Sequence, residues 1–184
     1  MTIAIAAIVA MLAIPSFRYV TNSNRIAAEV NGLLGDLQFA RGEAIKEGQP
    51  VTVCMSKLGQ TCDTTGNAWN SGWIVYSNPT FTGATTTPAA GSILRIQSTF
   101  TSTDTFLAAP AVSSITYNRE GYAIFGTGFN GTLITLHDST DTTAWTRCLA
   151  VSVNGMTQTA IVNQVINGVG KTTNGAASTG VTCQ

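Results

Sequence analysis

The sequence predicts an α+β protein: a long N-terminal helix packed on a mainly antiparallel β globular head. Residues 1–17 carry no charge, and residues 22–46 repeat apolar side chains at helical spacing. Beyond Gln49, short runs of β-branched and aromatic residues alternate with Gly-, Thr- and Asn-rich turns, which is typical of strands. Charged residues make up only 10 % of the chain. The hydroxyl and amide side chains that replace them suit strands and turns better than helices.

Residues 1–21 form the first predicted unit, an apolar helix whose first charge is Arg18. Its uncharged length is at the lower limit for a membrane-spanning helix. A terminal segment that is apolar on every face favours a membrane anchor over a buried core helix. Neither the basic start nor the cleavage site of a secretory signal peptide is present. The side chains expected in the membrane, or among neighbouring helices, are Ile3, Ile5, Ile8, Leu12 and Ile14.

Pro15 interrupts this apolar helix. A proline in a helix interior removes one backbone hydrogen bond and clashes with the preceding turn. We therefore expect a kink or local melting at Pro15. Neighbouring helices in a bilayer or a packed bundle can tolerate such a defect.

Residues 22–47 form the second unit, an amphipathic helix that packs on the head. Its apolar positions follow steps of three and four, which is the helical period. Ala27, Leu34 and Ile45 widen this stripe, while charged residues occupy the other faces. The stripe needs a partner, and the β head that follows is the natural one. The residues predicted to face the head are Ile26, Val30, Leu33, Leu37, Ala40 and Ala44.

Residues 48–184 form the β head, which begins after the helix-ending residues Gly48 and Pro50. The Arg119-Glu120-Gly121 and Asn154-Gly155 segments are predicted hairpin turns. Residues 79–91 are predicted to form an exposed loop, and the tail 167–184 is mobile unless Cys183 is bridged. The predicted strands are Val51–Met55, Gly72–Ser77, Ile93–Ser98, Ser114–Asn118, Ala123–Phe125, Thr132–His137, Arg147–Val153 and Thr157–Val162.

The four cysteines fall into two separated pairs, Cys54 with Cys62 and Cys148 with Cys183. Three connectivities are open to four cysteines, and pairing of neighbours is the simplest. An even count in an exported head favours disulfides over free thiols. Zinc is the alternative, but no C-x2-C pair is present and His137 is the only histidine. We therefore predict one bridge that closes a short loop and another that ties down the C-terminal tail.

Catalytic chemistry finds little support in the sequence. His137-Asp138 is isolated from any other histidine and is better explained as the end of a strand beside a turn. Gly126-Thr127-Gly128 lacks the further glycines of a dinucleotide site and is predicted to be a turn. Asp138 and Asp141 are acceptable calcium ligands, but two carboxylates in a turn are usually only solvated. We predict no enzyme, no metal site, no cofactor and no small-molecule substrate.

Charge and tryptophan content bear on binding partners. Nine basic and nine acidic residues give a net charge of zero, so no global field attracts nucleic acid. The basic residues Arg95, Arg119, Arg147 and Lys171 are scattered singly. Trp69, Trp73 and Trp145 could mark a sugar-binding or partner surface, although Trp73 lies within a predicted strand and is expected in the core.

Several motifs resemble one bacterial family along nearly the whole chain. Thr2–Phe17 is similar to the N-terminal helix of type IV pilins and pseudopilins. Leu37–Lys46, which contains Ala40-Arg41-Gly42-Glu43-Ala44, resembles the "L-x-x-A-R-S-E-A-I" stretch of the GspH/FimT group of minor pilins. The match extends through Val51–Cys54, Trp69-x-x-Gly72-Trp73 and Ile115–Asn118 with Gly121. The apolar helix alone indicates only pilins in general, and the Ala-Arg-x-Glu-Ala and Gly-Trp motifs indicate this branch.

The resemblance implies the pilin fold and a prepilin precursor. Such precursors have a short leader removed by a dedicated peptidase, then a methylated N-terminal Phe and a Glu four residues later. None of these is in the sequence, and matching Thr2 and Pro15 to the family helix places Met1 about seven residues inside the mature protein. The resemblance also implies a location: a single pass of the bacterial inner membrane with the head in the periplasm, then an extracellular pilus or a periplasmic pseudopilus.

The function implied by the resemblance is structural. The chain is expected to be a minor pilin that primes assembly of a type IV pilus or caps it, with other minor and major pilins as partners through the N-terminal helix. One alternative is a type II secretion pseudopilin at the pseudopilus tip. Another is a tip-displayed DNA receptor for natural transformation, which in some members uses a Gly-Arg-x-Arg-like motif. The corresponding segment here, Asn154–Gln158, contains no arginine, so DNA binding is disfavoured.

Overall fold

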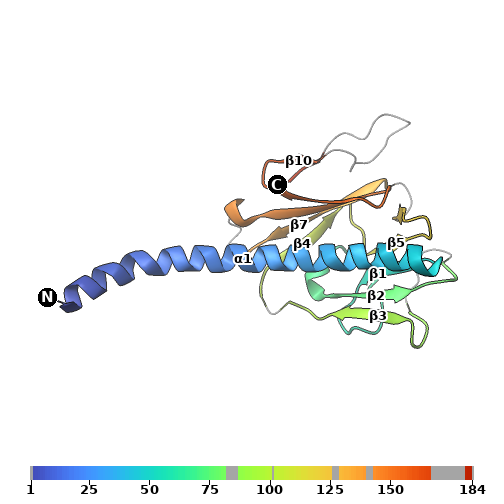
Figure 1. Cartoon of the computed structure of the whole chain (residues 1–184), viewed down its shortest axis with the longest axis horizontal. Helices are drawn as coiled ribbons and strands as arrows, with labels where there is room; N and C mark the ends of the chain where they lie inside the picture. Colours follow the sequence, from blue (N-terminus) through green and yellow to red (C-terminus); the bar gives the residue numbers. More distant parts are fainter. Residues whose placement is uncertain are drawn as a thin grey trace.

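The computed structural model describes residues 2–81, 87–100, 102–125, 129–139, 143–166 and 181–183. A single long helix, α1 (Thr2–Glu47), precedes every strand. Figure 1 shows that its C-terminal half lies along the β head and that its N-terminal part extends beyond the head. The other described elements are β1 (Val51–Met55), η1 (Trp69–Ser71), β2 (Trp73–Ser77), β3 (Ile93–Gln97), β4 (Thr105–Ala109), β5 (Ser114–Tyr117), β6 (Ala123–Ile124), β7 (Gly131–His137), η2 (Thr143–Trp145), β8 (Arg147–Ser152), β9 (Thr157–Ile161), β10 (Val165–Ile166) and β11 (Val181–Thr182).

The described strands form two main sheets and one small one. The first sheet has the order β3-β2-β1-β5-β6, and the second has the order β4-β7-β8-β9. β10 and β11 pair separately, and the pairings within all three sheets are antiparallel. The predicted α+β class, with a helix on a mainly antiparallel head, is confirmed.

Each strand predicted from the sequence is present, with its bounds changed by one residue at most. The turn at Arg119-Glu120-Gly121 joins β5 to β6, and Asn154-Gly155 lies between β8 and β9. β4, β10 and β11 were not predicted from the sequence. The turn predicted at 126–128 lies outside the described residues, as do residues 82–86 of the predicted loop and most of the tail.

Helix α1 is continuous through Pro15, so the structure shows no local melting there. The kink expected at Pro15 stays a prediction. The six residues predicted to face the head, from Ile26 to Ala44, are all at most 2 % exposed. Ile45 was predicted to widen this stripe, but it is 52 % exposed. Ile45 follows Ala44 by one residue, and this rotation of about 100° carries it off the buried face.

The main core lies between the helical stripe and both large sheets. Helix α1 contacts β1, β2 and β5 of the first sheet and β7, β8 and β9 of the second. Trp69 and Trp73 are fully buried in this core, which confirms the prediction for Trp73. Because one stripe packs on two sheets, the helix joins the two sheets.

Candidate assembly surface

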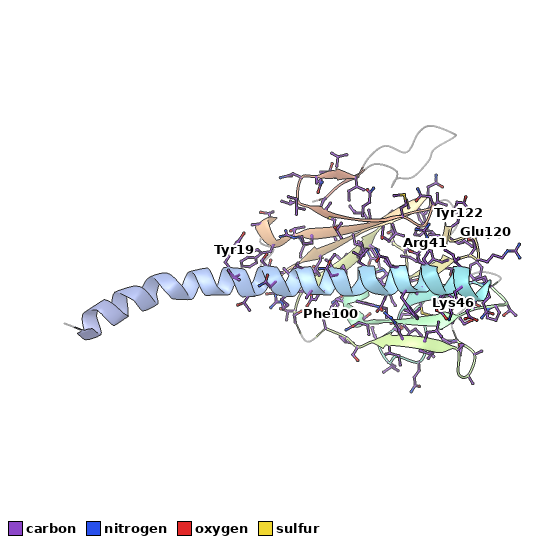
Figure 2. The ribbon with its side chains drawn as sticks, viewed as in Figure 1. Tyr19, Arg41, Lys46, Phe100, Glu120 and Tyr122 are labelled. Atoms are coloured by element: carbon purple, nitrogen blue, oxygen red, sulfur yellow. A yellow bond between two sulfur atoms is a disulfide. The ribbon has the colours of Figure 1, made fainter. Side chains whose placement is uncertain are left out.

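The N-terminal part of α1 is the most prominent surface of the chain. At about 1.5 Å per residue, the 46-residue helix is roughly 70 Å long. The Tyr19 ring packs at a tilt of 58° against Trp145 of η2, with 5.6 Å between ring centroids, and Figure 2 shows Tyr19 at the end of the head where the helix leaves it. The segment before Tyr19 therefore projects as an arm. The side chains of Ile3, Ile5, Ile8, Leu12 and Ile14 lie outside the described residues.

Within the part of the chain that the structure describes, no helix is both long enough and apolar enough to cross a membrane.

Charged side chains link α1 to the head in addition to the apolar stripe. The Asp36 carboxylate accepts hydrogen bonds from Trp73 Nε1 at 2.8 Å and Arg95 Nη1 at 2.9 Å. The Arg95 guanidinium also lies over the Phe39 ring, 3.7 Å from its centroid. Asp36 thus connects the helix to both β2 and β3. From the sequence, Asp36 is placed only on the helix faces outside the apolar stripe and Arg95 only among scattered basic residues, because nothing in the local pattern indicates a partner 59 residues away.

A second polar cluster lies nearer to the arm. Arg25 Nη2 donates to Asp104 Oδ1 at 2.9 Å, and the Asp104 side chain is fully buried. Glu29, one turn further along α1, accepts a hydrogen bond from Ser102 Oγ at 3.3 Å. Burial raises the pKa of Glu29, and the nearby Asp104 carboxylate raises it further. This cluster ties α1 to the segment before β4.

The far end of α1 is held by two tight turns (Figure 2). Arg41 Nε donates to the carbonyl oxygen of Gly121 at 3.1 Å. Gly121 and Gly155 both have left-handed backbones, with φ of +82° and +75°. A Cβ on Gly155 would collide with the carbonyl oxygen of Gly121, so the β8–β9 hairpin rests directly on the β5–β6 turn. Arg41, Gly121 and Gly155 therefore join the helix to both sheets.

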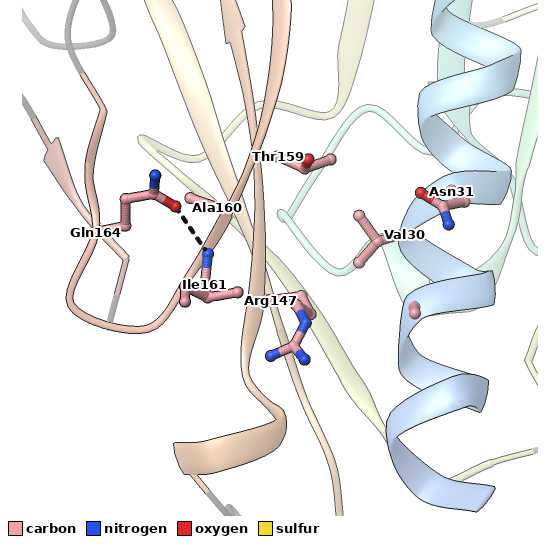
Figure 3. A pocket seen from close by; sticks show the side chains of 8 residues that line it. Val30, Asn31, Arg147, Thr159, Ala160, Ile161 and Gln164 are labelled. Atoms are coloured by element: carbon pink, nitrogen blue, oxygen red, sulfur yellow. Dashed lines mark hydrogen bonds between the residues drawn. The ribbon is translucent and has the colours of Figure 1, made fainter. Parts of the chain in front are cut away.

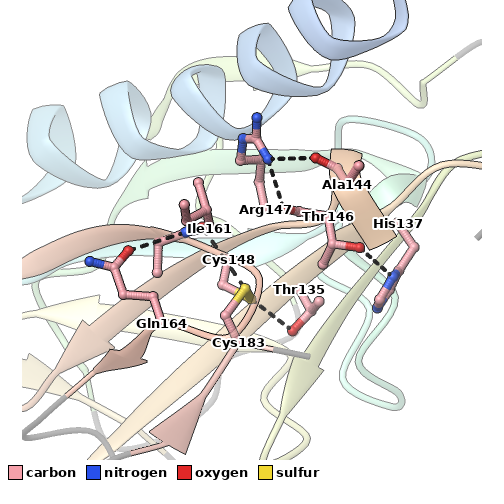
Figure 4. Close-up of a disulfide and its surroundings, with 10 residues drawn as sticks. Thr135, His137, Ala144, Thr146, Arg147, Cys148, Ile161, Gln164 and Cys183 are labelled. Carbon is pink, nitrogen blue, oxygen red and sulfur yellow. Dashed lines mark hydrogen bonds between the residues drawn. A yellow bond between two sulfur atoms is a disulfide. The ribbon is translucent and has the colours of Figure 1, made fainter. Parts of the chain in front are cut away.

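The cysteines form the two predicted disulfides, each between the two cysteines that lie nearest to each other in the sequence. Cys54 is bonded to Cys62 with a Cα–Cα distance of 5.5 Å, and Cys148 is bonded to Cys183 at 5.8 Å. The first bridge closes the loop after β1. The second joins β8 to the segment after β11 (Figure 4). All four cysteines are thus oxidised, which fits an exported protein.

Two hollows lie along the seam between α1 and the β8–β9 hairpin. The first, of about 210 Å³, is bordered by Ala27, Val30 and Asn31 on the helix and by Arg147 and Ile161 on the strands. Figure 3 shows the Arg147 guanidinium between the helix and the strands. Arg147 Nη1 donates to the carbonyl oxygens of Ala144 and Thr146. The second hollow, of about 420 Å³, lies beside Arg41 and Gly155.

Of the candidate catalytic and calcium-binding residues, the structure describes His137 and Asp138. His137 ends β7, and its Nδ1 lies 3.1 Å from Thr146 Oγ1. Asp138 is buried, whereas Asp141 lies outside the described residues. Among the described residues, no group of three His, Cys, Asp or Glu side chains is placed to hold a metal ion.

Comparison with known proteins agrees with this architecture. A family model described as "Type II transport protein GspH" matches residues 29–155. The chain belongs to the GspH family. The match includes the Arg41, Gly72-Trp73 and Gly121 motifs, all of the first sheet, and β4, β7 and β8 of the second. No curated protein matches the chain at a significant level.

Two crystal structures of the type IV minor pilin FimU of Pseudomonas aeruginosa resemble this GspH family member. One shares 20 % sequence identity with a TM-score of 0.52, over 74 % of this chain and 91 % of FimU. The other also shares 20 % identity, with a TM-score of 0.54 over 78 % of this chain and 92 % of FimU. At this identity the likeness establishes the fold, which is the pilin fold.

Membership in the GspH family places the chain among minor pilins and pseudopilins. These are structural subunits and not enzymes. The family implies association with other pilins and assembly into a pilus or a pseudopilus. The resemblance inferred from the sequence motifs is therefore confirmed.

Proposed function

We propose that the chain is a structural minor pilin that primes assembly of a type IV pilus or caps it. The observation that carries this proposal is the helical arm, which continues an apolar sequence beyond the head (Figure 1). Roughly 25 Å of such helix, at 1.5 Å per residue, needs apolar surroundings. Inner-membrane lipid before assembly and neighbouring pilin helices afterwards both supply them. In this proposal Ile3, Ile5, Ile8, Leu12 and Ile14 contact lipid or those helices.

The head supports the same proposal. Its two disulfides suit the oxidising periplasm, where the head of an inner-membrane pilin resides before assembly. The buried stripe and the polar links fix the head to the C-terminal half of α1. A subunit of this kind moves from membrane to filament without exposing the apolar arm to water.

Ile8→Asp tests the role of the arm. A strain of the source bacterium that lacks the chain is complemented with the wild type, with Ile8→Asp or with Leu58→Asp as the matched control, because Leu58 is 82 % exposed on the head. We expect Ile8→Asp, but not Leu58→Asp, to reduce the number of surface pili seen by electron microscopy. A charge in an apolar helical environment is costly by about 3 kcal/mol. Normal piliation with Ile8→Asp at equal protein level would refute the proposed role of the arm.

A type II secretion pseudopilin is the second candidate. The description of the matching family as a type II transport protein favours it. The same strains separate the two functions, because a pseudopilin is required for release of type II secretion substrates into the medium. Loss of that secretion with pili intact would assign the chain to the secretion machine.

A further inference from the structure

The larger hollow on the seam lies at the end of the head opposite the arm. Helix α1 contributes Arg41, Gly42 and Ile45 to its lining, and the β8–β9 hairpin contributes Gly155 and Met156. Its volume of about 420 Å³ is enough for one or two amino-acid side chains. Gly155, which borders the hollow, also lies against the β5–β6 turn and beside Arg41.

Arg41 supplies a positive charge to this hollow. Its Nε donates to the Gly121 carbonyl oxygen, and the described part of the chain offers its guanidinium no carboxylate. This distinguishes Arg41 from three other described arginines, which are paired with Asp104, Asp36 and Glu120. The guanidinium nitrogens beyond Nε therefore keep their capacity to donate to a ligand.

Apolar side chains lie on either side of this charge. Ile45 is 52 % exposed on the helix and Met156 is 51 % exposed on the hairpin. The nearby Lys46 pairs with Glu43 and Glu47, and Arg119 pairs with Glu120. These neighbouring charges sum to minus one, because two carboxylates share Lys46, and Arg41 balances that sum without pairing with either of them. One guanidinium without a carboxylate partner among the described residues therefore lies between two exposed apolar side chains.

We propose that this hollow binds an Asp or Glu side chain that a partner protein presents between apolar residues. A guanidinium matches a carboxylate with two parallel hydrogen bonds, and Ile45 and Met156 would pack on the flanking apolar side chains. DNA is the less suitable anion, because its binding depends on several unpaired cations along the phosphate backbone. The inference goes beyond the proposed function, since it names a recognition chemistry that holds for a pilus or a pseudopilus alike.

Two glycines on α1 provide the variant and its matched control. Gly42 borders the hollow, and a Cβ at Gly42 or at Gly32 meets nothing within 4 Å. Gly42→Glu places a carboxylate at the hollow, and Gly42→Gln adds the same bulk without charge. Gly32→Glu makes the same change about 15 Å away along the helix axis. Each substitution replaces a helical glycine with a better helix former, so folding is preserved.

The test is a titration of the isotope-labelled full chain in detergent micelles. The probe is the capped peptide acetyl-Val-Glu-Leu-amide, with acetyl-Val-Gln-Leu-amide and a short DNA duplex as comparisons. The NMR signals of the Arg41 Nε–H group and the Met156 methyl group report on the hollow directly. This measurement is independent of piliation, so its failure is distinguishable from failure of the proposed function.

We expect the Glu peptide to shift both signals and to bind about tenfold more tightly than the Gln peptide, because charge-assisted hydrogen bonds are about twice as strong as neutral ones. Gly42→Glu should weaken binding by a further factor of about ten, while Gly42→Gln and Gly32→Glu stay within about threefold of wild type. Equal binding of the two peptides, or unchanged binding by Gly42→Glu, would overturn the proposal. A larger Arg41 shift with DNA than with the Glu peptide would overturn it in favour of nucleic acid.

Discussion

Two alanine substitutions can separate two contributions to stability. One is the close packing of the β8–β9 hairpin on the β5–β6 turn, and the other is backbone strain. Gly155 and Gly91 have nearly the same left-handed backbone, with φ of +75° and +77°. A Cβ at Gly155 would collide with the Gly121 carbonyl oxygen, whereas a Cβ at Gly91 meets nothing within 4 Å. We therefore expect Gly155→Ala to destabilise the chain more than Gly91→Ala does.

The magnitude follows from two contributions. The left-handed backbone costs an alanine about 1–2 kcal/mol in both variants. Displacing the packed backbone in Gly155→Ala adds about 1–3 kcal/mol. For a chain of 184 residues, each kcal/mol lowers Tm by about 2–4 °C. We thus expect a decrease of about 4 °C for Gly91→Ala and about 10 °C for Gly155→Ala.

Thermal and urea unfolding of the full chain, followed by circular dichroism with both disulfides intact, would measure the difference. The comparison is valid where the transition is two-state and the urea dependence m stays constant among the variants. Equal losses in the two variants would refute the inference that contact between the two turns stabilises the head.

Glu29→Gln and removal of either disulfide lead to further predictions. The pKa of Glu29 is raised above its ordinary value, so ionisation of Glu29 is disfavoured in the folded state. The ionised carboxylate therefore destabilises the fold once the pH rises above the ordinary pKa of a glutamate. Glu29→Gln should therefore raise Tm at about pH 7 and raise it less at about pH 4, and an equal gain at both would contradict the assigned cause. The Cys148–Cys183 bridge spans 35 residues and the Cys54–Cys62 bridge spans 8. Replacing Cys148 and Cys183 by serine should lower the free energy of unfolding by about 4 kcal/mol, and replacing Cys54 and Cys62 by about 2.5 kcal/mol. Urea unfolding that gives the reverse order would refute the loop-entropy argument.

The helix and most strands could be predicted because their signals are local. Apolar residues from Ile26 to Ala44 repeat at the helical period. The run at β1 is rich in β-branched residues, the run at β8 has an apolar centre, and both lie beside turn signals. β4 was missed although Phe106 and Ala108 alternate correctly between exposed neighbours. Its alanines favour strands weakly, and its partner β7 is far along the chain.

The links between helix and head could not be predicted for a different reason. Arg25 and Asp104 are 79 residues apart, and Arg41 is 80 residues from Gly121. A charge on a helix surface has the same local pattern whether it is solvated or paired with a distant residue. Only the arrangement of both sheets against α1 brings these groups together. The family motif identified Arg41, but not its hydrogen bond to Gly121.

The arrangement of α1 also determines how the head responds to mechanical load. Neither disulfide attaches to the helix, so the arm is joined to the head covalently only where α1 runs into β1. A pull on the arm along the helix axis loads the stripe from Ile26 to Ala44, about 27 Å long, in shear. All the side chains of the stripe then bear the load at the same time, because the covalent joint lies at the far end of the stripe. A sideways pull would instead peel the helix away one turn at a time, beginning at Tyr19 and Trp145.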